Sequence, residues 1–151
     1  MDTRSVGNIM EEVVSLSDKI RRVSENAAGK AGDCTAQQLR ICTFLQKCGG
    51  SVSQKEIEKF TGLRRPTVSF LVDSLVTRGL AVRNTSLSDR RMRTVTLTPQ
   101  GDEVVRKCAA QLKDIYRIIG VSISSEELGL FSAVVEKLDK ILELASVKVT
   151  I

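Results

Sequence analysis

Arginine side chains gather in one segment of this sequence. Between positions 64 and 93 there are seven arginines and two acidic residues, whereas the rest of the chain holds 16 basic and 16 acidic residues. This segment therefore carries the whole formal net charge of +5. Guanidinium groups bind phosphates and guanine edges, so their concentration favours a polyanionic partner over a basic face that is merely solvated. The arginines are Arg64, Arg65, Arg78, Arg83, Arg90, Arg91 and Arg93.

The composition argues against several other chemistries. Histidine is absent, so a Ser-His-Asp or Cys-His catalytic site cannot form, and no glycine-rich phosphate loop occurs. The four cysteines form no CxxC pair, which disfavours structural zinc. Aromatic residues make up 3% of the chain, which disfavours stacking on single-stranded bases. We therefore expect no enzyme activity, no metal and no cofactor.

Residues 54–78 have the pattern of a helix-turn-helix. Ser53 and Glu56 are spaced as a capping box before the first helix. Gly62 is placed to end that helix in a left-handed conformation. Pro66 suits the first turn of the second helix, where its missing N–H has no helical acceptor. The second helix carries one apolar stripe at helical spacing, formed by Val68, Leu71, Val72, Leu75 and Val76.

The other face of the second helix suits the major groove of DNA. Arg64 and Arg65 stand at its start, where they could hold phosphates or guanine edges. Serine and threonine hydroxyls both donate and accept hydrogen bonds, and an apolar atom can contact a thymine methyl. An amphipathic helix pair inside a helical bundle is the alternative. The residues expected on or beside this face are Thr67, Ser69, Phe70, Asp73, Ser74 and Thr77.

After Gly79 the apolar period changes from helical to alternating. Residues 80–83 and 93–98 predict two strands, with Val95 and Leu97 pointing inward. The polar segment between them predicts the loop of a β-hairpin, which is the wing of a winged helix. Its loop contains Asp89, Arg90 and Arg91.

Helices are expected on both sides of this winged segment. One runs from Val6 to about Asn26, and residues 28–33 predict a flexible connection. Another begins after Thr35, with Gln38 at the capping-box position. A helix from Thr98 and Pro99 is expected to end near Ile119 because Gly120 follows, and Ser124 starts the last helix.

The predicted fold is mostly α with a small β-hairpin wing (α+β). We interpret the chain as a single intertwined domain. Residues 31–101 form a winged helix-turn-helix DNA-binding lobe, termed the winged lobe below, and residues 1–30 and 102–151 form dimerisation helices. The long apolar stripes of the terminal helices favour a homodimer. The alternative is that these helices fold back on their own winged lobe.

The sequence resembles the MarR family of transcription regulators over about residues 35–101. The resemblance rests on Thr35-Ala36-Gln37-Gln38-Leu39, Ser53-Gln54-Lys55-Glu56-Ile57, Thr67-Val68-Ser69, Leu71-Val72-Asp73-Ser74-Leu75 and Arg78-Gly79-Leu80. It continues through Ser88-Asp89-Arg90-Arg91 and Val95-Thr96-Leu97-Thr98-Pro99-Gln100-Gly101. The D-x-R of the wing followed by L-T-x-x-G is its most specific part. Phe70 departs from the family, where a basic residue is frequent, and Arg64 stands where relatives often have a good helix cap.

This resemblance implies a homodimer that binds a pseudo-palindromic operator in double-stranded DNA, with half-site centres about one helical turn apart. It implies that Arg91 enters the minor groove and that Asp89 orients it. It also implies a ligand-responsive repressor, with a small-molecule effector between the dimerisation helices and the winged lobe. The expected DNA-binding residues are Ser53, Gln54, Arg64, Arg65, Thr67, Ser69, Phe70, Ser74, Arg90 and Arg91.

Two alternatives to a ligand-responsive regulator remain open. Cys34 and Cys48 lie near helix ends and could sense oxidation, Cys34 being expected to be exposed, whereas Cys42 and Cys108 lie on apolar stripes and are expected to be buried. A winged helix can also serve as a protein-interaction module without a specific DNA site. The sequence shows neither a signal peptide nor a membrane-spanning run, so we expect a cytoplasmic protein with no membrane partner.

Overall fold

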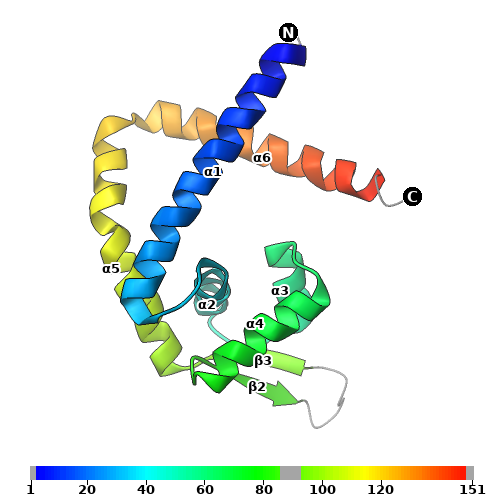
Figure 1. Ribbon diagram of the computed structural model, residues 1–151, viewed down its shortest axis with the longest axis vertical. Coiled ribbons are helices and arrows are strands. Elements are labelled where there is room, and N and C mark those ends of the chain that lie inside the picture. The colour runs from blue at the N-terminus through cyan, green and yellow to red at the C-terminus, as the bar shows by residue number, and fades with distance from the viewer. Residues whose placement is uncertain (1–2, 86–92, 149–151) are drawn as a thin grey trace. The chain divides into compact units, whose positions relative to one another are not determined.

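The computed structural model describes residues 3–85 and 93–148, with the side chains of 146–148 left out. In these ranges the elements follow the order α1 (Thr3–Gly32), α2 (Ala36–Cys48), β1 (Val52–Ser53), α3 (Gln54–Thr61), α4 (Arg65–Thr77), β2 (Ala81–Thr85), β3 (Arg93–Leu97), α5 (Pro99–Ser122) and α6 (Ser125–Lys148) (Figure 1). This is the predicted mostly helical fold with a β-hairpin, and the prediction is confirmed.

The chain forms two compact units, Met1–Leu112 and Lys113–Ile151. In the first unit the three strands form an antiparallel sheet in the order β1-β3-β2. Val95 at the centre of β3 pairs with Val52 of β1 and with Arg83 of β2. Because Val95 and Val52 are buried, the sheet contributes one apolar face to the core.

The core of the first unit is built from helical stripes and this sheet face. The predicted α4 residues Val68, Leu71, Val72 and Leu75 are all buried, as are Ile41 and Leu45 of α2. Each such aliphatic side chain stabilises the fold by about 1.5–3 kcal/mol when it leaves water. Burial of the stripe fixes which face of α4 turns outward.

Local capping signals predicted several helix starts correctly. Thr35 with Gln38 begins α2 and Ser53 with Glu56 begins α3, each as a reciprocal capping box. Ser124 and Glu127 make the same pair of hydrogen bonds before α6. Hydrogen bonds from Ser53 hold the pKa of the Glu56 carboxyl below its usual range.

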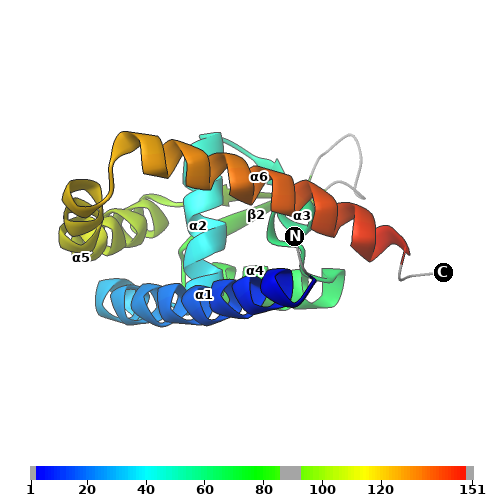
Figure 2. The ribbon, with the colours of Figure 1, turned by 90° about the horizontal axis from the view of Figure 1, so that it is seen from above.

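Two predicted breaks in helices are wrong. Helix α1 does not end near Asn26 but continues to Gly32, because Ala28 and Ala31 are buried against the core and keep the last turn in place. Figure 2 shows α1 as one unbroken rod. Gly120 lies inside α5, which ends at Ser122. A helical glycine costs only about 1 kcal/mol relative to alanine, which neighbouring helix-forming residues offset.

The junction between β3 and α5 depends on two residues of the L-T-x-x-G motif. The Thr98 hydroxyl donates to the Gly79 carbonyl oxygen (2.7 Å) and accepts from the Gly101 amide (3.1 Å). A Cβ on Gly101 would overlap the carbonyl oxygen of Leu80. The motif therefore lets the start of α5 approach the turn after α4 closely.

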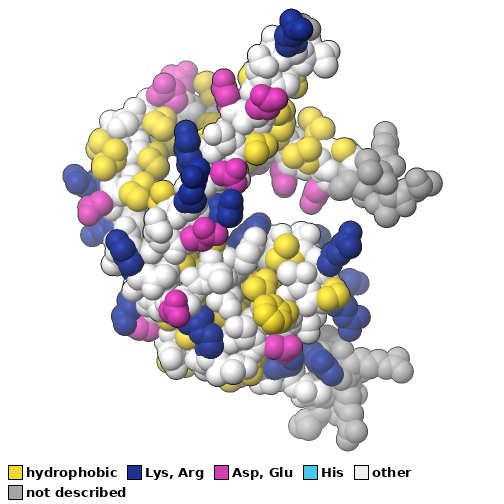
Figure 3. Space-filling view, in the orientation of Figure 1, with side chains coloured by type: hydrophobic (Ala, Val, Ile, Leu, Met, Phe, Trp, Pro, Cys, Tyr) yellow, Lys and Arg dark blue, Asp and Glu magenta, His cyan; other side chains and the backbone are white. Residues whose placement is uncertain are grey.

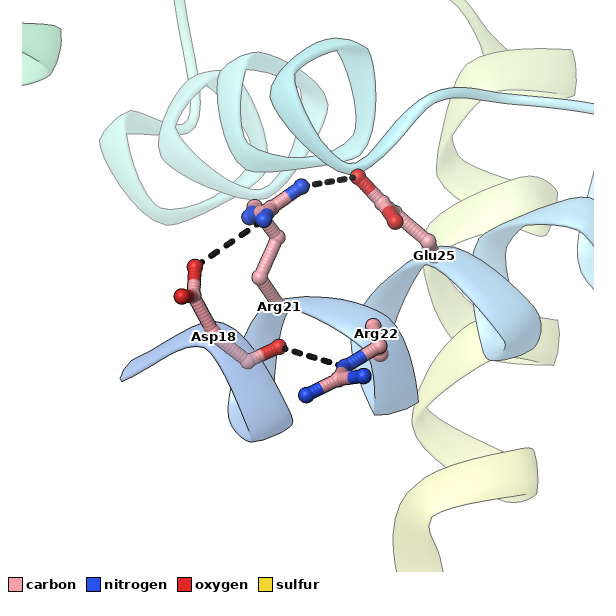
Figure 4. Close-up of polar contacts among 4 residues, drawn as sticks. All are labelled: Asp18, Arg21, Arg22 and Glu25. Carbon is pink, nitrogen blue, oxygen red and sulfur yellow. Dashed lines mark hydrogen bonds and ion pairs between the residues drawn. The ribbon is translucent and has the colours of Figure 1, made fainter. Parts of the chain in front are cut away.

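Most of α1 has a polar and an apolar side. Arg21 pairs with Asp18 at 2.9 Å and with Glu25 at 3.4 Å, and the Nε of Arg22 donates to the Asp18 carbonyl oxygen (Figure 4). The 100° rotation per helical residue places these groups opposite the apolar stripe. The exposed apolar side chains of that stripe are Val6, Ile9, Val13, Leu16, Ile20 and Val23.

The second unit contains the end of α5 and all of α6. Apolar side chains along both helices are exposed in the single chain, as are those of α1. Among the described residues no single helix is long and apolar enough to cross a membrane. Helix α5 and residues 125–145 reach that length and apolar composition only when taken together, and they are bent relative to each other. The exposed α6 side chains include Leu128, Phe131, Val134, Val135, Ile141 and Leu142.

Candidate nucleic-acid interface

The turn between α3 and α4 is held by local hydrogen bonds. Gly62 caps α3 with a φ of 68°, a left-handed conformation that glycine adopts without strain. The Thr61 hydroxyl donates to the Ile57 carbonyl oxygen (2.7 Å) and accepts from the Leu63 amide (3.3 Å). The turn therefore sets the direction in which α4 leaves α3.

Helix α4 begins at the predicted pair of arginines. Arg64 is the N-cap residue and, within the described part of the chain, its side chain makes no capping hydrogen bond. Arg64 and Arg65 are both exposed, beside the first-turn amides of α4. In Figure 3 basic side chains cover the edge of the winged lobe where α3 meets α4. Exposed amides, a helix dipole and two guanidinium groups together favour an anion here.

The outer face of α4 is exposed, and its side chains are small apart from one aromatic ring. Thr67, Asp73 and Thr77 are exposed, and Ser69 is half-buried. Phe70 is 72% exposed, so this large apolar side chain takes almost no part in the core. Its exposure makes a local packing role against the described residues weak and leaves the ring available for a partner.

An ion pair across to the sheet supports this helix. Nη1 of Arg83 on β2 donates to Oδ1 of Asp73 at 2.5 Å. The pairing fixes α4 against β2, and it offsets a carboxylate that would otherwise repel phosphate. Arg83 can reach Asp73 because Ala81 and Arg83 face the helices, whereas Val82 faces outward and is 45% exposed.

Ser74, an expected DNA-binding residue, and Arg78 of the basic segment make hydrogen bonds with neighbouring elements. The Ser74 hydroxyl lies 2.9 Å from Nε2 of Gln38 and accepts its hydrogen bond. Nη1 of Arg78 donates to Oε1 of Gln38 (3.2 Å), and Nη2 donates to the carbonyl oxygen of Gly32. Both side chains are therefore engaged within the winged lobe, and a DNA contact of Ser74 stays a prediction. Sequence spacing gave no sign of this network.

The described part of the wing is a regular hairpin. β2 and β3 pair from Ala81 with Leu97 to Thr85 with Arg93, and Nδ2 of Asn84 donates to Oγ1 of Thr96 at 3.0 Å. Arg93 is exposed at the start of β3. The predicted wing residues Asp89, Arg90 and Arg91 lie outside the described residues.

Of the four cysteines, one lies in an environment different from the expected one. Cys34 was expected to be exposed, but it is 5% exposed and its Sγ contacts Nη1 of Arg78 at 3.6 Å. The reason is that α1 extends to Gly32 and folds the connection against α4. Cys42 and Cys108 are buried as predicted, and Cys48 is exposed. Redox sensing stays a prediction for these positions.

The fold and this surface together define a winged helix-turn-helix protein. Among solved structures it resembles a MarR family transcription regulator, with 19% identity, 95% of each chain covered and a TM-score of 0.81. It also resembles a MarR mutant from E. coli complexed with operator DNA (17% identity, 91% of this chain and 99% of that chain, TM-score 0.74). A MepR mutant from S. aureus bound to an oligodeoxyribonucleotide is also similar (22% identity, 94% of this chain and 99% of that chain, TM-score 0.60). These likenesses establish the fold.

A family match covers part of the chain. Residues 32–92 match the model described as the MarR family. The matched range begins at the last residue of α1 and includes α2, β1, α3, α4 and β2. Over this segment the chain is similar to the MarR family, the family that the sequence resembles.

Proposed function

We propose that the chain is a homodimeric, sequence-specific transcription regulator that binds a pseudo-palindromic operator in double-stranded DNA. The observation that carries the proposal is the outer face of α4. It is exposed and begins with Arg64 and Arg65; the core packs behind it, and the surface pair of Asp73 with Arg83 ties it to β2. Two structures of similar fold contain DNA, and this supports the same partner for this chain.

In this proposal α4 enters the major groove. Arg64, Arg65 and the first-turn amides hold phosphates, while Thr67 and Ser69 contact base edges or phosphates. Phe70 supplies an apolar contact, for which a thymine methyl is the matching group. Ser53 and Gln54, at the start of α3, are proposed to contact the adjacent DNA backbone.

The wing is proposed to read the neighbouring minor groove. Arg90 and Arg91 supply positive charge there, and Asp89 orients Arg91. A narrow minor groove concentrates negative potential, so an inserted arginine contributes selectivity for DNA shape. This part of the proposal rests on the family resemblance and on the position of the hairpin beside α4.

The dimer is proposed to form through α1, the end of α5 and α6. Their apolar side chains are exposed in the single chain, and so many exposed aliphatic residues are unusual for a soluble monomer. Burying them between two copies would also place two α4 helices on one duplex. Repression relieved by a small-molecule effector is the finer part of the proposal and is supported by the family alone.

The test is binding to fragments selected by the wild-type protein from its source genome. Arg65→Ala and Arg91→Ala should each weaken binding about tenfold and reduce the slope of log K against log salt by about 1.8, because each removes one positive charge from both copies of the dimer, at about 0.9 per charge. Arg106→Ala is the matched control, since Arg106 is an exposed arginine on α5 that pairs with Asp102 and Glu103. Unchanged affinity in both interface variants would instead favour a protein-interaction module.

A further inference from the structure

A partly buried polar network joins the end of α1 to the end of α4. Arg78 is the C-cap residue of α4, and its Nη2 donates to the carbonyl oxygen of Gly32, the last residue of α1. Its Nη1 donates to Oε1 of Gln38 at 3.2 Å and contacts Sγ of Cys34 at 3.6 Å. One guanidinium therefore ties α4 to α1, to the α1–α2 connection and to α2.

Gln38 makes a second link to the same helix. Its side-chain amide is only 7% exposed, and Oε1 also accepts from the backbone amide of Thr35 at 3.0 Å. Its Nε2 donates to the hydroxyl of Ser74, one turn before Arg78. Because the amide is buried and its hydrogen bonds run to fixed partners, a change at any member leaves polar groups unpaired.

The end of α1 is also confined from its other side. A Cβ on Gly32 would lie 2.8 Å from Cγ2 of Val104 on α5, so backbone and side chain are in close contact there. Ala28 and Ala31 are buried in the same region. The last turn of α1 is thus held between α4 and α5, whereas the exposed apolar stripe lies toward its N-terminus.

We propose that this network sets the half-site spacing that the dimer accepts, with Arg78 as a positioning residue that does not touch DNA. We term it the Arg78 latch; its members are Gly32, Cys34, Gln38, Ser74 and Arg78. The inference rests on the proposed function, in which α1 joins the two copies and α4 reads DNA. A fixed angle between α1 and α4 in each copy fixes the separation of the two α4 helices.

The test uses a selected operator and the same duplex with one base pair inserted between its half-sites. The insertion moves one half-site by about 3.4 Å and rotates it by roughly 35°. The measured quantity is an affinity ratio: the affinity for the selected operator divided by the affinity for the lengthened duplex. Arg78→Lys keeps the charge but loses the planar fork that spans Gly32 and Gln38. Ser74→Ala removes one neutral member of the latch, and Arg106→Lys is the control on the exposed face of α5.

We expect the affinity ratio to fall about tenfold in Arg78→Lys and by a smaller factor in Ser74→Ala, because the loosened dimer adapts to the longer spacer. The salt slope on the selected operator should be unchanged in both. Arg106→Lys should behave as wild type. Circular dichroism checks folding, and if Arg78→Lys does not fold, the ratio in Ser74→Ala decides.

Two results would overturn the inference while leaving the proposed function intact. One is a wild-type ratio in both latch variants. The other comes from a further variant, Arg78→Gln, which removes the charge: a salt slope that drops by about 1.8 with an unchanged ratio would mark Arg78 as a phosphate contact in both copies. Failure of the wild-type protein to bind any selected DNA would remove the proposed function, and this inference with it.

Discussion

At the scale of single residues, burial decides what each cysteine can do. Burial raises the pKa of the Cys42 thiol to about 12 and also raises the pKa of the Cys108 thiol. Both thiols therefore stay protonated at neutral pH, and the thiolate is the reactive form. Cys34 is shielded by the Arg78 latch, whereas Cys48 is exposed at the end of α2.

We expect one thiol, that of Cys48, to react rapidly with a thiol reagent in the native protein. The other three should react only as the chain unfolds, since they are buried. The measurement is a timed thiol titration at neutral pH, with and without denaturant. Cys48→Ser should abolish the fast phase, while Cys42→Ser should retain it. A fast phase of two thiols would contradict the burial of the other three cysteines, Cys34 included.

The arginines illustrate what a sequence can and cannot predict at this scale. Their concentration indicated a basic segment, and Arg64 and Arg65 are exposed at the start of α4 as predicted. Arg78 and Arg83 belong to the same segment, but Arg78 hydrogen-bonds Gly32 and Gln38 in a partly buried site, and Arg83 pairs with Asp73 at the surface. Charge counting treats all of these residues alike, because their partners are set by tertiary neighbours far away in the sequence.

At the scale of elements, signals within four residues were read correctly and longer-range effects were not. A capping box joins residues three apart, so the start of α3 followed from Ser53 and Glu56 alone. The end of α1 depends on the burial of Ala28 and Ala31 against other elements. The glycines beside them favoured the prediction of a flexible connection instead. The wing was predicted from its alternating pattern, although Val82 faces outward.

The two glycines of α5 provide a matched prediction. Gly101→Ala should destabilise the fold by about 2 kcal/mol or more, because its Cβ would overlap Leu80 and the side chain of Leu97. Gly120→Ala should be neutral or stabilise by up to about 1 kcal/mol, since no atom lies within 4 Å of its added Cβ. Denaturant unfolding measures both. Equal effects of the two substitutions would contradict the close approach of α5 to the turn after α4.

At the scale of the whole molecule, the exposed apolar side chains of the terminal helices and the exposed arginines at the start of α4 lie on different elements. The apolar side chains of α1, the end of α5 and α6 are exposed in one chain, while the exposed arginines at the start of α4 belong to the winged lobe. In the proposed dimer a second copy covers these helices, and two α4 helices, one from each chain, bind one operator. No pattern in the sequence identifies the operator or an effector, because base preference depends on groove contacts and a ligand on a shaped cavity.

The number of chains bound to one duplex tests the account most directly. Sedimentation of the protein with a labelled, selected operator, repeated at increasing salt, gives both the stoichiometry and the charge dependence. We expect two chains per duplex, with an affinity that falls steeply as salt rises. A single chain on the duplex, or binding that is insensitive to salt, would contradict it.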